Sequence, residues 1–151
     1  MRFVLFSNAI LFTEEKLKFL KQSQIYVSYN FSVDGNKTCH NSARVYKNGK
    51  GSWDDVLKGI EVYKKVYQKD EKYFPVTKFM VSSDNIDYIL DITKDMAERT
   101  NRLSLGLVRE GWDDESVQKY EKNMTELAEY YIKNIDKKLW IDLFLIPIMD
   151  K

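Results

Sequence analysis

The polar residues between positions 27 and 52 are the part of the sequence whose types and spacing could do chemistry. A strand pattern ends there in Ser32 and Asp34-Gly35, and a loop carrying His40 and Arg44 then leads through a Gly-rich turn to a helix that begins near Ser52. A serine at a strand end can contact a ligand or be an ordinary strand residue. Arg44 can bind an anionic group, or it can be solvated or pair with a nearby acid such as Asp34.

The same segment holds the one histidine and the one cysteine of the chain, His40 and Cys39. No nucleophile pattern surrounds them, and adjacent residues do not easily turn both side chains to one point. We therefore expect a structural His40 and predict no catalytic residue and no metal ligand. The turn Gly49-x-Gly51-Ser52 could seat an anion at a helix N-terminus. It lacks the spacing and the lysine of a P-loop, so we interpret it as a turn and a helix cap.

Strand and helix signals alternate four times and must position these residues. The predicted units lie near 2–23, 25–68, 74–99 and 102–134, followed by an apolar tail at 139–149. Strands that alternate with helices of this length are typical of βα units with a parallel sheet. Right-handed crossovers then curl the units into an arc. The sequence predicts a single α/β domain over 1–151, a partial (β/α) barrel of about four units.

The two ends of this arc need partners. The run Arg2 to Ser7 is continuously apolar, as expected of a strand buried on both faces. It starts at residue 2, and the apolar tail ends the chain, so each end would leave an unpaired hydrophobic edge. The arc is expected to be cut at both ends.

Bulk composition excludes several classes of protein. The 24 basic and 23 acidic residues give a net charge of +1 and are well mixed, whereas a nucleic-acid-binding domain needs a basic excess on one face. No apolar run reaches the roughly 18 residues of a membrane helix. One cysteine makes no internal disulfide, so a reducing, cytoplasmic location is expected.

The order of residues from Ser32 to Ser52 resembles the middle of a radical S-adenosylmethionine (SAM) enzyme of the peptide- and sulfatase-maturing kind. In that family a strand ending in Ser-x-Asp-Gly is followed by a His, an Arg and a Lys-Asn-Gly-x-Gly-Ser turn. The matching residues here are Ser32, Asp34, Gly35, His40, Arg44, Lys47, Asn48, Gly49, Gly51 and Ser52. Ser7-Asn8-Ala9 resembles the family's Thr-Asn-Gly strand end, with Ser and Ala in place of Thr and Gly. The segment SLGLVREGWDDES also resembles the corresponding strand and helix start of peptide maturases.

This resemblance implies a fold, a cofactor and three contact residues. The family has an open barrel of six βα units with a cysteine-rich (SPASM) extension, and the chain resembles units three to six. The resemblance implies that Ser32 contacts SAM, that Arg44 pairs with its methionyl carboxylate, and that Asn8 also lies at the cofactor. A planar guanidinium suits a carboxylate because it can donate two parallel hydrogen bonds.

The chain departs from the family in its cysteines. Radical SAM chemistry needs a 4Fe-4S cluster held by a Cys-x3-Cys-x2-Cys loop, with one open iron for SAM. This chain has Cys39 alone, in a different loop. We therefore expect that the chain by itself neither holds the cluster nor makes a radical.

Three hypotheses about function follow. The first is a truncated radical SAM protein derived from a peptide-modifying maturase, whose family substrate is a peptide. The second is a non-catalytic binding or assembly module whose open edges pair with a copy of itself or with a chain that supplies the missing barrel units. The third is a small SAM-binding protein or transferase without a cluster.

Overall fold

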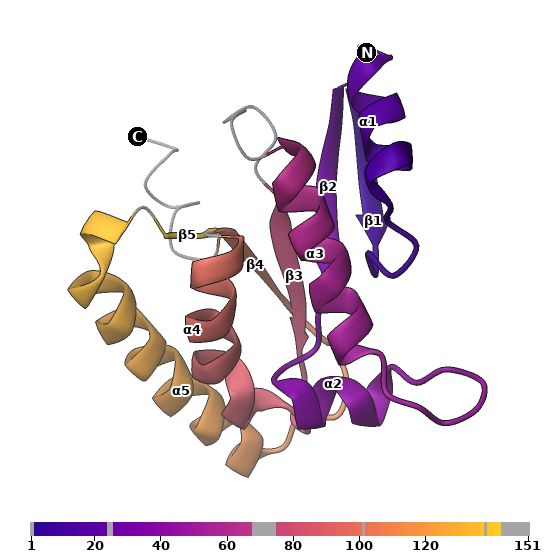
Figure 1. Ribbon diagram of the computed structural model, residues 1–151. Coiled ribbons are helices and arrows are strands. Elements are labelled where there is room, and N and C mark those ends of the chain that lie inside the picture. Colours follow the sequence, from indigo (N-terminus) through magenta and orange to yellow (C-terminus); the bar gives the residue numbers. More distant parts are fainter. Residues whose placement is uncertain (1, 24–25, 68–74, 101, 138, 143–151) are drawn as a thin grey trace.

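The computed structural model describes residues 2–23, 26–67, 75–100, 102–137 and 139–142. Five strands form one sheet in the order β1-β2-β3-β4-β5, and every neighbouring pair is parallel. The strands are β1 (Arg2–Ser7), β2 (Tyr26–Ser32), β3 (Val76–Val81), β4 (Arg102–Leu107) and β5 (Trp140–Ile141). The helices are α1 (Glu14–Gln22), α2 (Lys37–Ala43), α3 (Trp53–Tyr67), α4 (Ile89–Arg99) and α5 (Asp114–Lys133), with 3-10 turns η2 (Ile86–Tyr88) and η3 (Ile135–Lys137). The predicted α/β class is confirmed (Figure 1).

The long helices cover one face of the sheet (Figure 1). Val27, Tyr29, Phe31 and Val33 alternate along β2 and just beyond it, and their side chains are buried against the helices. The hydroxyls of the buried tyrosines are paired, since Tyr29 bonds to Tyr67 at 3.2 Å and Tyr67 donates to the Leu17 carbonyl at 3.2 Å. Aromatic burial and satisfied hydroxyls together join α1 and α3 to the sheet.

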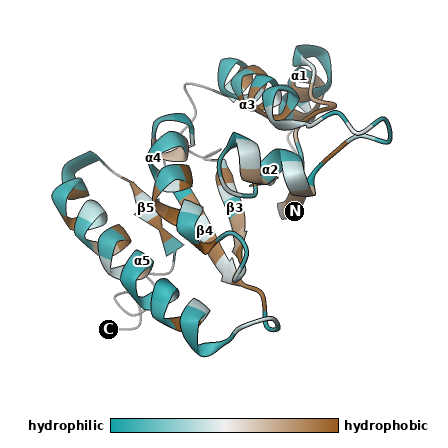
Figure 2. Cartoon of the chain, turned by 90° about the horizontal axis from the view of Figure 1, so that it is seen from below, coloured by the Kyte–Doolittle hydropathy of each residue, from teal (hydrophilic) through white to brown (hydrophobic). Residues whose placement is uncertain are grey.

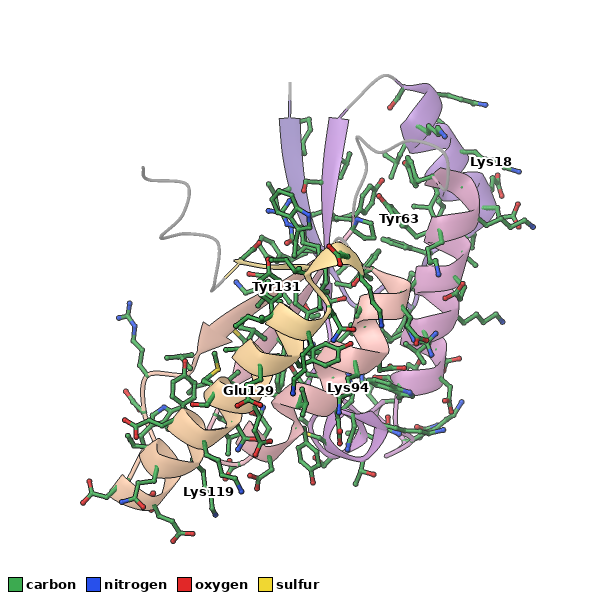
Figure 3. All side chains as sticks on the ribbon, turned by 90° about the vertical axis from the view of Figure 1, so that its left-hand side faces the viewer. Lys18, Tyr63, Lys94, Lys119, Glu129 and Tyr131 are labelled. Atoms are coloured by element: carbon green, nitrogen blue, oxygen red, sulfur yellow. The ribbon has the colours of Figure 1, made fainter. Side chains whose placement is uncertain are left out.

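The outer sides of the helices are polar. Figure 2 shows the hydrophilic colour along the outward side of α5 and the hydrophobic colour along β3 and β4. Lys18 on α1 and Lys119 and Glu129 on α5 project from the surface (Figure 3), and each takes part in an ion pair with a residue four positions away. Exposed pairs of this kind contribute little stability, because water and salt screen the two charges. None of the described helices combines the length and apolar character needed to cross a bilayer.

We call the sheet face opposite the helices the open face. Pleating turns every second side chain of a strand toward it. Its side chains include Phe6 of β1, Ser28, Asn30 and Ser32 of β2, Lys78 and Met80 of β3, and Ser104 of β4. Those of β2, β3 and β4 in this set are half-buried. The open face is therefore richer in polar side chains than the helix-covered face.

The prediction that the first strand is buried on both faces is wrong for the part of the chain described. Phe3, Val4, Leu5 and Phe6 are 38–60% exposed. The physical reason is position: β1 is the edge of the sheet and pairs with β2 alone among the described strands. The expectation of an unpaired apolar edge at this end agrees with the structure.

The segment after β2 also differs from the prediction of a plain loop. Residues 37–43 form the helix α2, and the Asn36 side chain caps it by accepting from the Cys39 N–H at 3.1 Å. Gly35 precedes it with φ +67°, and a Cβ there would lie 2.7 Å from the Cβ of Cys39. A residue without a side chain is thus required for the sharp turn from β2 into α2.

Candidate functional site

The residues singled out in the sequence follow the carboxyl ends of β1 and β2. This edge of the sheet lies beside α2, at the bottom of Figure 1. Ligands of parallel α/β folds bind at this edge, because the loops that follow the strands converge there. The edge is therefore the candidate binding site.

Arg44 is brought to the end of β2 by an acid. Its Nε donates to Oδ2 of Asp34 at 2.5 Å, with the Asp34 side chain 17% and the Arg44 side chain 36% exposed. Asp34 is two residues beyond Ser32, the last residue of β2. The pair uses one guanidinium nitrogen and leaves the two terminal nitrogens of Arg44 able to donate to an anion.

The alternative considered for Arg44, pairing with Asp34, is thus what the structure shows. Such a pair also fixes the guanidinium in one orientation, which lowers the entropy cost of binding a second group. Ionic pairing with Asp34 and ligand binding through the terminal nitrogens are compatible. The role of Arg44 toward a carboxylate stays a prediction.

A buried histidine holds the loops of this edge together. Nδ1 of His40 accepts from the backbone N–H of Asp34 at 3.2 Å, so Nε2 carries the proton and donates to Oγ of Ser52 at 3.1 Å. The Ser52 hydroxyl in turn donates to the carbonyl of Arg44 at 2.8 Å, and the imidazole packs edge-on against Trp53 with 5.4 Å between ring centroids. We call these interactions the His40 network. It ties β2, α2 and the start of α3 around Arg44.

Both ring nitrogens of His40 are occupied, and its side chain has no exposed surface. Burial lowers the pKa of His40 below its ordinary value, and the nearby Arg44 charge lowers it further against the opposing effect of Asp34. The lowered pKa favours the neutral ring, and both of its nitrogens bond to other parts of the fold, while its structural role stays a prediction.

The His40 network makes the stability of the protein depend on pH. Below the ordinary histidine pKa of 6.5 the unfolded chain binds a proton that the folded chain does not. Stability is therefore full above that pH and falls as the pH drops through it, by at most about 1.4 kcal/mol per pH unit. Urea unfolding between about pH 5.5 and about pH 7.5 should show this loss. A His40→Gln variant should lack the step, and an equal step in the variant would assign it to other groups.

The helix α3, which follows the Gly-rich turn, is capped by a side chain that the sequence did not indicate. The predicted cap, Ser52, instead uses its hydroxyl within the His40 network. Oδ1 of Asn41 caps the helix by accepting from the Trp53 N–H at 2.9 Å. A Cβ on Gly51 would lie 2.2 Å from Cγ of Asn41. Because Asn41 acts across two helices, no local sequence signal identifies it.

Asn8 and Ser32 differ in how far they are engaged. Oδ1 of Asn8 accepts from the Ile10 N–H at 3.3 Å, which forms a turn after β1, and the side chain is exposed. The Ser32 hydroxyl has no hydrogen-bond partner among the described residues, and the side chain is half-buried. Both side chains retain hydrogen-bonding groups for a ligand, and their cofactor role stays a prediction.

Cys39 does not offer a reactive thiol. Burial raises the pKa of Cys39, and the negative charges of Asp34 and Asp84 raise it further. The protonated thiol is a poor nucleophile and a poor metal ligand. Across the described ranges, His, Cys, Asp and Glu side chains form no group of three that could hold a metal ion. The described residues therefore do not fit a 4Fe-4S cluster.

Trp112 lies in the SLGLVREGWDDES segment, between β4 and α5. Trp112 donates from Nε1 to the Val108 carbonyl at 2.6 Å and packs edge-on against Tyr120. Together with Leu107, Arg109 and Val117 these residues line an apolar cavity of about 370 Å³. Trp112 thus joins the end of β4 to the first turns of α5.

The chain matches known proteins by fold, whereas comparison with family models and curated proteins gives no match. Solved structures do match: anSMEcpe, a radical SAM anaerobic sulfatase maturase, with AdoMet (SAM) bound has a TM-score of 0.73 at 21% sequence identity. The fold is that of part of a radical SAM barrel.

A second structure of that maturase gives a TM-score of 0.75 with AdoMet bound, and a third contains both AdoMet and a Cp18Cys peptide. Each match covers 93% of this chain and 40% of the maturase chain. The chain therefore spans less than half of the proteins it matches. The predicted resemblance is confirmed at the level of fold.

Proposed function

We propose that the chain binds SAM at the carboxyl-end edge of its sheet, as part of a radical SAM barrel of the peptide- and sulfatase-maturing kind. One observation carries this proposal. Arg44 pairs with Asp34, two residues beyond Ser32 at the end of β2, in a fold that matches part of an AdoMet-bound maturase. Ser32 would contact SAM, Arg44 would hold its methionyl carboxylate, and Asn8 would line the same site.

The reaction of such a barrel needs a group that these residues do not hold. That group is the family's 4Fe-4S cluster, which would supply the one-electron reduction of SAM on which radical chemistry depends. The three cysteines would come from outside these 151 residues, from another segment or another chain in the cytoplasm. The contribution of the described residues is to bind and orient SAM.

Calorimetric titration with SAM tests this proposal. Wild-type protein should bind, and Arg44→Ala should weaken binding by about 10- to 100-fold, because a charge-assisted bond is worth about 1.5–3 kcal/mol. Ser32→Ala should weaken it by about 5-fold, as expected for one neutral hydrogen bond. Lys47→Ala removes a charge from the exposed turn nearby and should change nothing. Absence of binding in folded wild-type protein, or equal effects of all three variants, would contradict the proposal.

A second candidate function is an assembly module, and β1 favours it. Four consecutive apolar side chains of β1, from Phe3 to Phe6, are at least 38% exposed, and such an edge is a template for pairing with another strand. A copy of the chain or a chain with further βα units would cover it. Size-exclusion chromatography with light scattering should then show self-association or a stable complex. A monodisperse monomer that takes up no partner would count against this function.

A further inference from the structure

One row of side chains crosses the open face beside the proposed site. Ser32 on β2 is in register with Lys78 on β3, and Lys78 is in register with Ser104 on β4. Neighbouring strands lie about 4.8 Å apart, so the backbone of Lys78 lies between the backbones of the two serines. The register thus brings one cationic and two hydroxyl side chains to three adjacent strands of the open face.

The three side chains of the row are half-buried, and the contact that the structure gives the Lys78 ammonium is with an aromatic ring. Among the described residues, no carboxylate lies within 4.0 Å of the Lys78 ammonium, and no hydrogen bond is made by the Ser32 or Ser104 hydroxyl. A partly buried cation ordinarily has a counter-charge or water, because removing charge from water is costly. The row therefore has the character of a site prepared for an anion.

Two neighbours bound the row. The Lys78 ammonium lies over the ring of Phe6, 5.4 Å from its centroid, which draws the side chain across β2 toward β1. On the other side of Lys78 along β3, Met80 packs against Gly106, where a Cβ would lie 2.8 Å from the methionine sulfur. The row is thus polar in its centre and apolar at these neighbours.

We propose that Lys78, with Ser32 and Ser104, binds a carboxylate of the ligand on the open face. The Arg44 guanidinium already shares its charge with Asp34, whereas Lys78 has no acidic partner in the described chain. The carboxylate could be that of SAM, which Lys78 would then share with Arg44, or that of an acidic residue of a peptide, and the chemistry of recognition is the same. The inference rests on the proposed function, because it takes the ligand to be SAM or the peptide substrate.

The test compares ligands that differ by one carboxylate. Wild type, Lys78→Met, Lys78→Arg and Ser104→Ala are titrated with SAM and with decarboxylated SAM, which lacks only that group. They are also titrated with a capped peptide containing a single Glu and with its Gln counterpart. Lys94→Met, on the outer side of α4 over the Tyr130 ring, is the matched control. Thermal unfolding verifies that each variant is folded.

If the carboxylate is that of SAM, Lys78→Met should weaken the binding of SAM by about 10- to 100-fold and leave the binding of decarboxylated SAM unchanged. Ser104→Ala should weaken the binding of SAM by about 5-fold, and Lys78→Arg should largely preserve it. If the carboxylate is that of a peptide, the same pattern should distinguish the Glu peptide from the Gln peptide.

The inference is overturned if Lys78→Met changes the binding of neither SAM nor the Glu peptide, or if it weakens the binding of SAM and of decarboxylated SAM equally. These outcomes are separate from failure of the proposed function, which is loss of SAM binding in wild-type protein. If wild-type protein binds the Glu peptide through Lys78 but does not bind SAM, the result supports carboxylate binding by Lys78 and contradicts SAM as the cofactor. Wild type that binds neither ligand would overturn both.

Discussion

Replacing His40 by alanine is expected to destabilise the folded chain by about 4 kcal/mol. The side chain is fully buried, so its removal leaves a cavity beside Trp53. It also removes the acceptor of the Asp34 N–H and the donor to Oγ of Ser52, whose hydroxyl keeps its own hydrogen bond to the Arg44 carbonyl. Urea unfolding at pH 7 measures the loss.

Two further variants separate the parts of this effect. Thr38→Ala alters an exposed position on the same helix and should change the free energy of unfolding by less than about 0.5 kcal/mol. Ser52→Ala removes one acceptor of the His40 network and should cost about 1–3 kcal/mol. A His40→Ala variant as stable as Thr38→Ala would show that the network does not hold this edge together.

Replacing Gly59 by alanine is expected to destabilise the fold by about 3 kcal/mol. A Cβ at this position in α3 would lie 2.1 Å from the carbonyl oxygen of Ala9, a backbone atom that cannot move aside freely. Ala9 follows β1 with φ +59° and is fully buried. The loop carrying Asn8 therefore packs directly on the helix, and any side chain at position 59 would push it away.

Whether Gly59→Ala raises or lowers the stability of the fold tests the close contact between Ala9 and α3. In a helix interior without such a contact, Gly→Ala stabilises by about 1 kcal/mol through helix propensity. Lys58→Ala, at the preceding exposed position, serves as the control and should lie within about 0.5 kcal/mol of wild type. A Gly59→Ala variant more stable than wild type would rule out the close approach of Ala9 to α3.

His40→Ala and Gly59→Ala affect the two loops of the candidate site, one after β2 and one after β1. The His40 network holds the loop from Asp34 to Ser52, which carries Arg44. The contact of Gly59 with Ala9 holds the loop that carries Asn8. Both loops are thus positioned from α3, whose first turn and middle contact the ends of β2 and β1. This arrangement explains how exposed loop residues can have fixed positions at the edge of the sheet.

The fold class could be predicted because it depends on local patterns. Alternating strand and helix signals indicate a parallel α/β arc without knowledge of any contact. The burial of β1 could not, since an apolar strand at the edge of a sheet has the same composition as one at its centre. Helix α2 was missed because its polar sequence, Lys37–Ala43, lacks an apolar stripe and is held through the contacts of His40.

Part of the candidate site could also be predicted. The pairing of Arg44 with Asp34 was one of two alternatives that the spacing left open, and side-chain geometry was needed to choose between them. Lys78 was overlooked in an otherwise apolar strand. Alternation would have indicated it, because an isolated lysine within a strand that also buries Phe79 must face the opposite side of the sheet. Its register with Ser32 required the structure.

Titration of isotope-labelled protein with SAM, followed by two-dimensional amide NMR, reports both whether SAM binds and where it binds. We expect saturable shifts that are concentrated at Asn8, Ser32 and Arg44 and at the loops that carry them. Spectra that do not change with SAM, or shifts confined to the outer surfaces of α1 and α5, would contradict the claim that this edge of the sheet binds SAM.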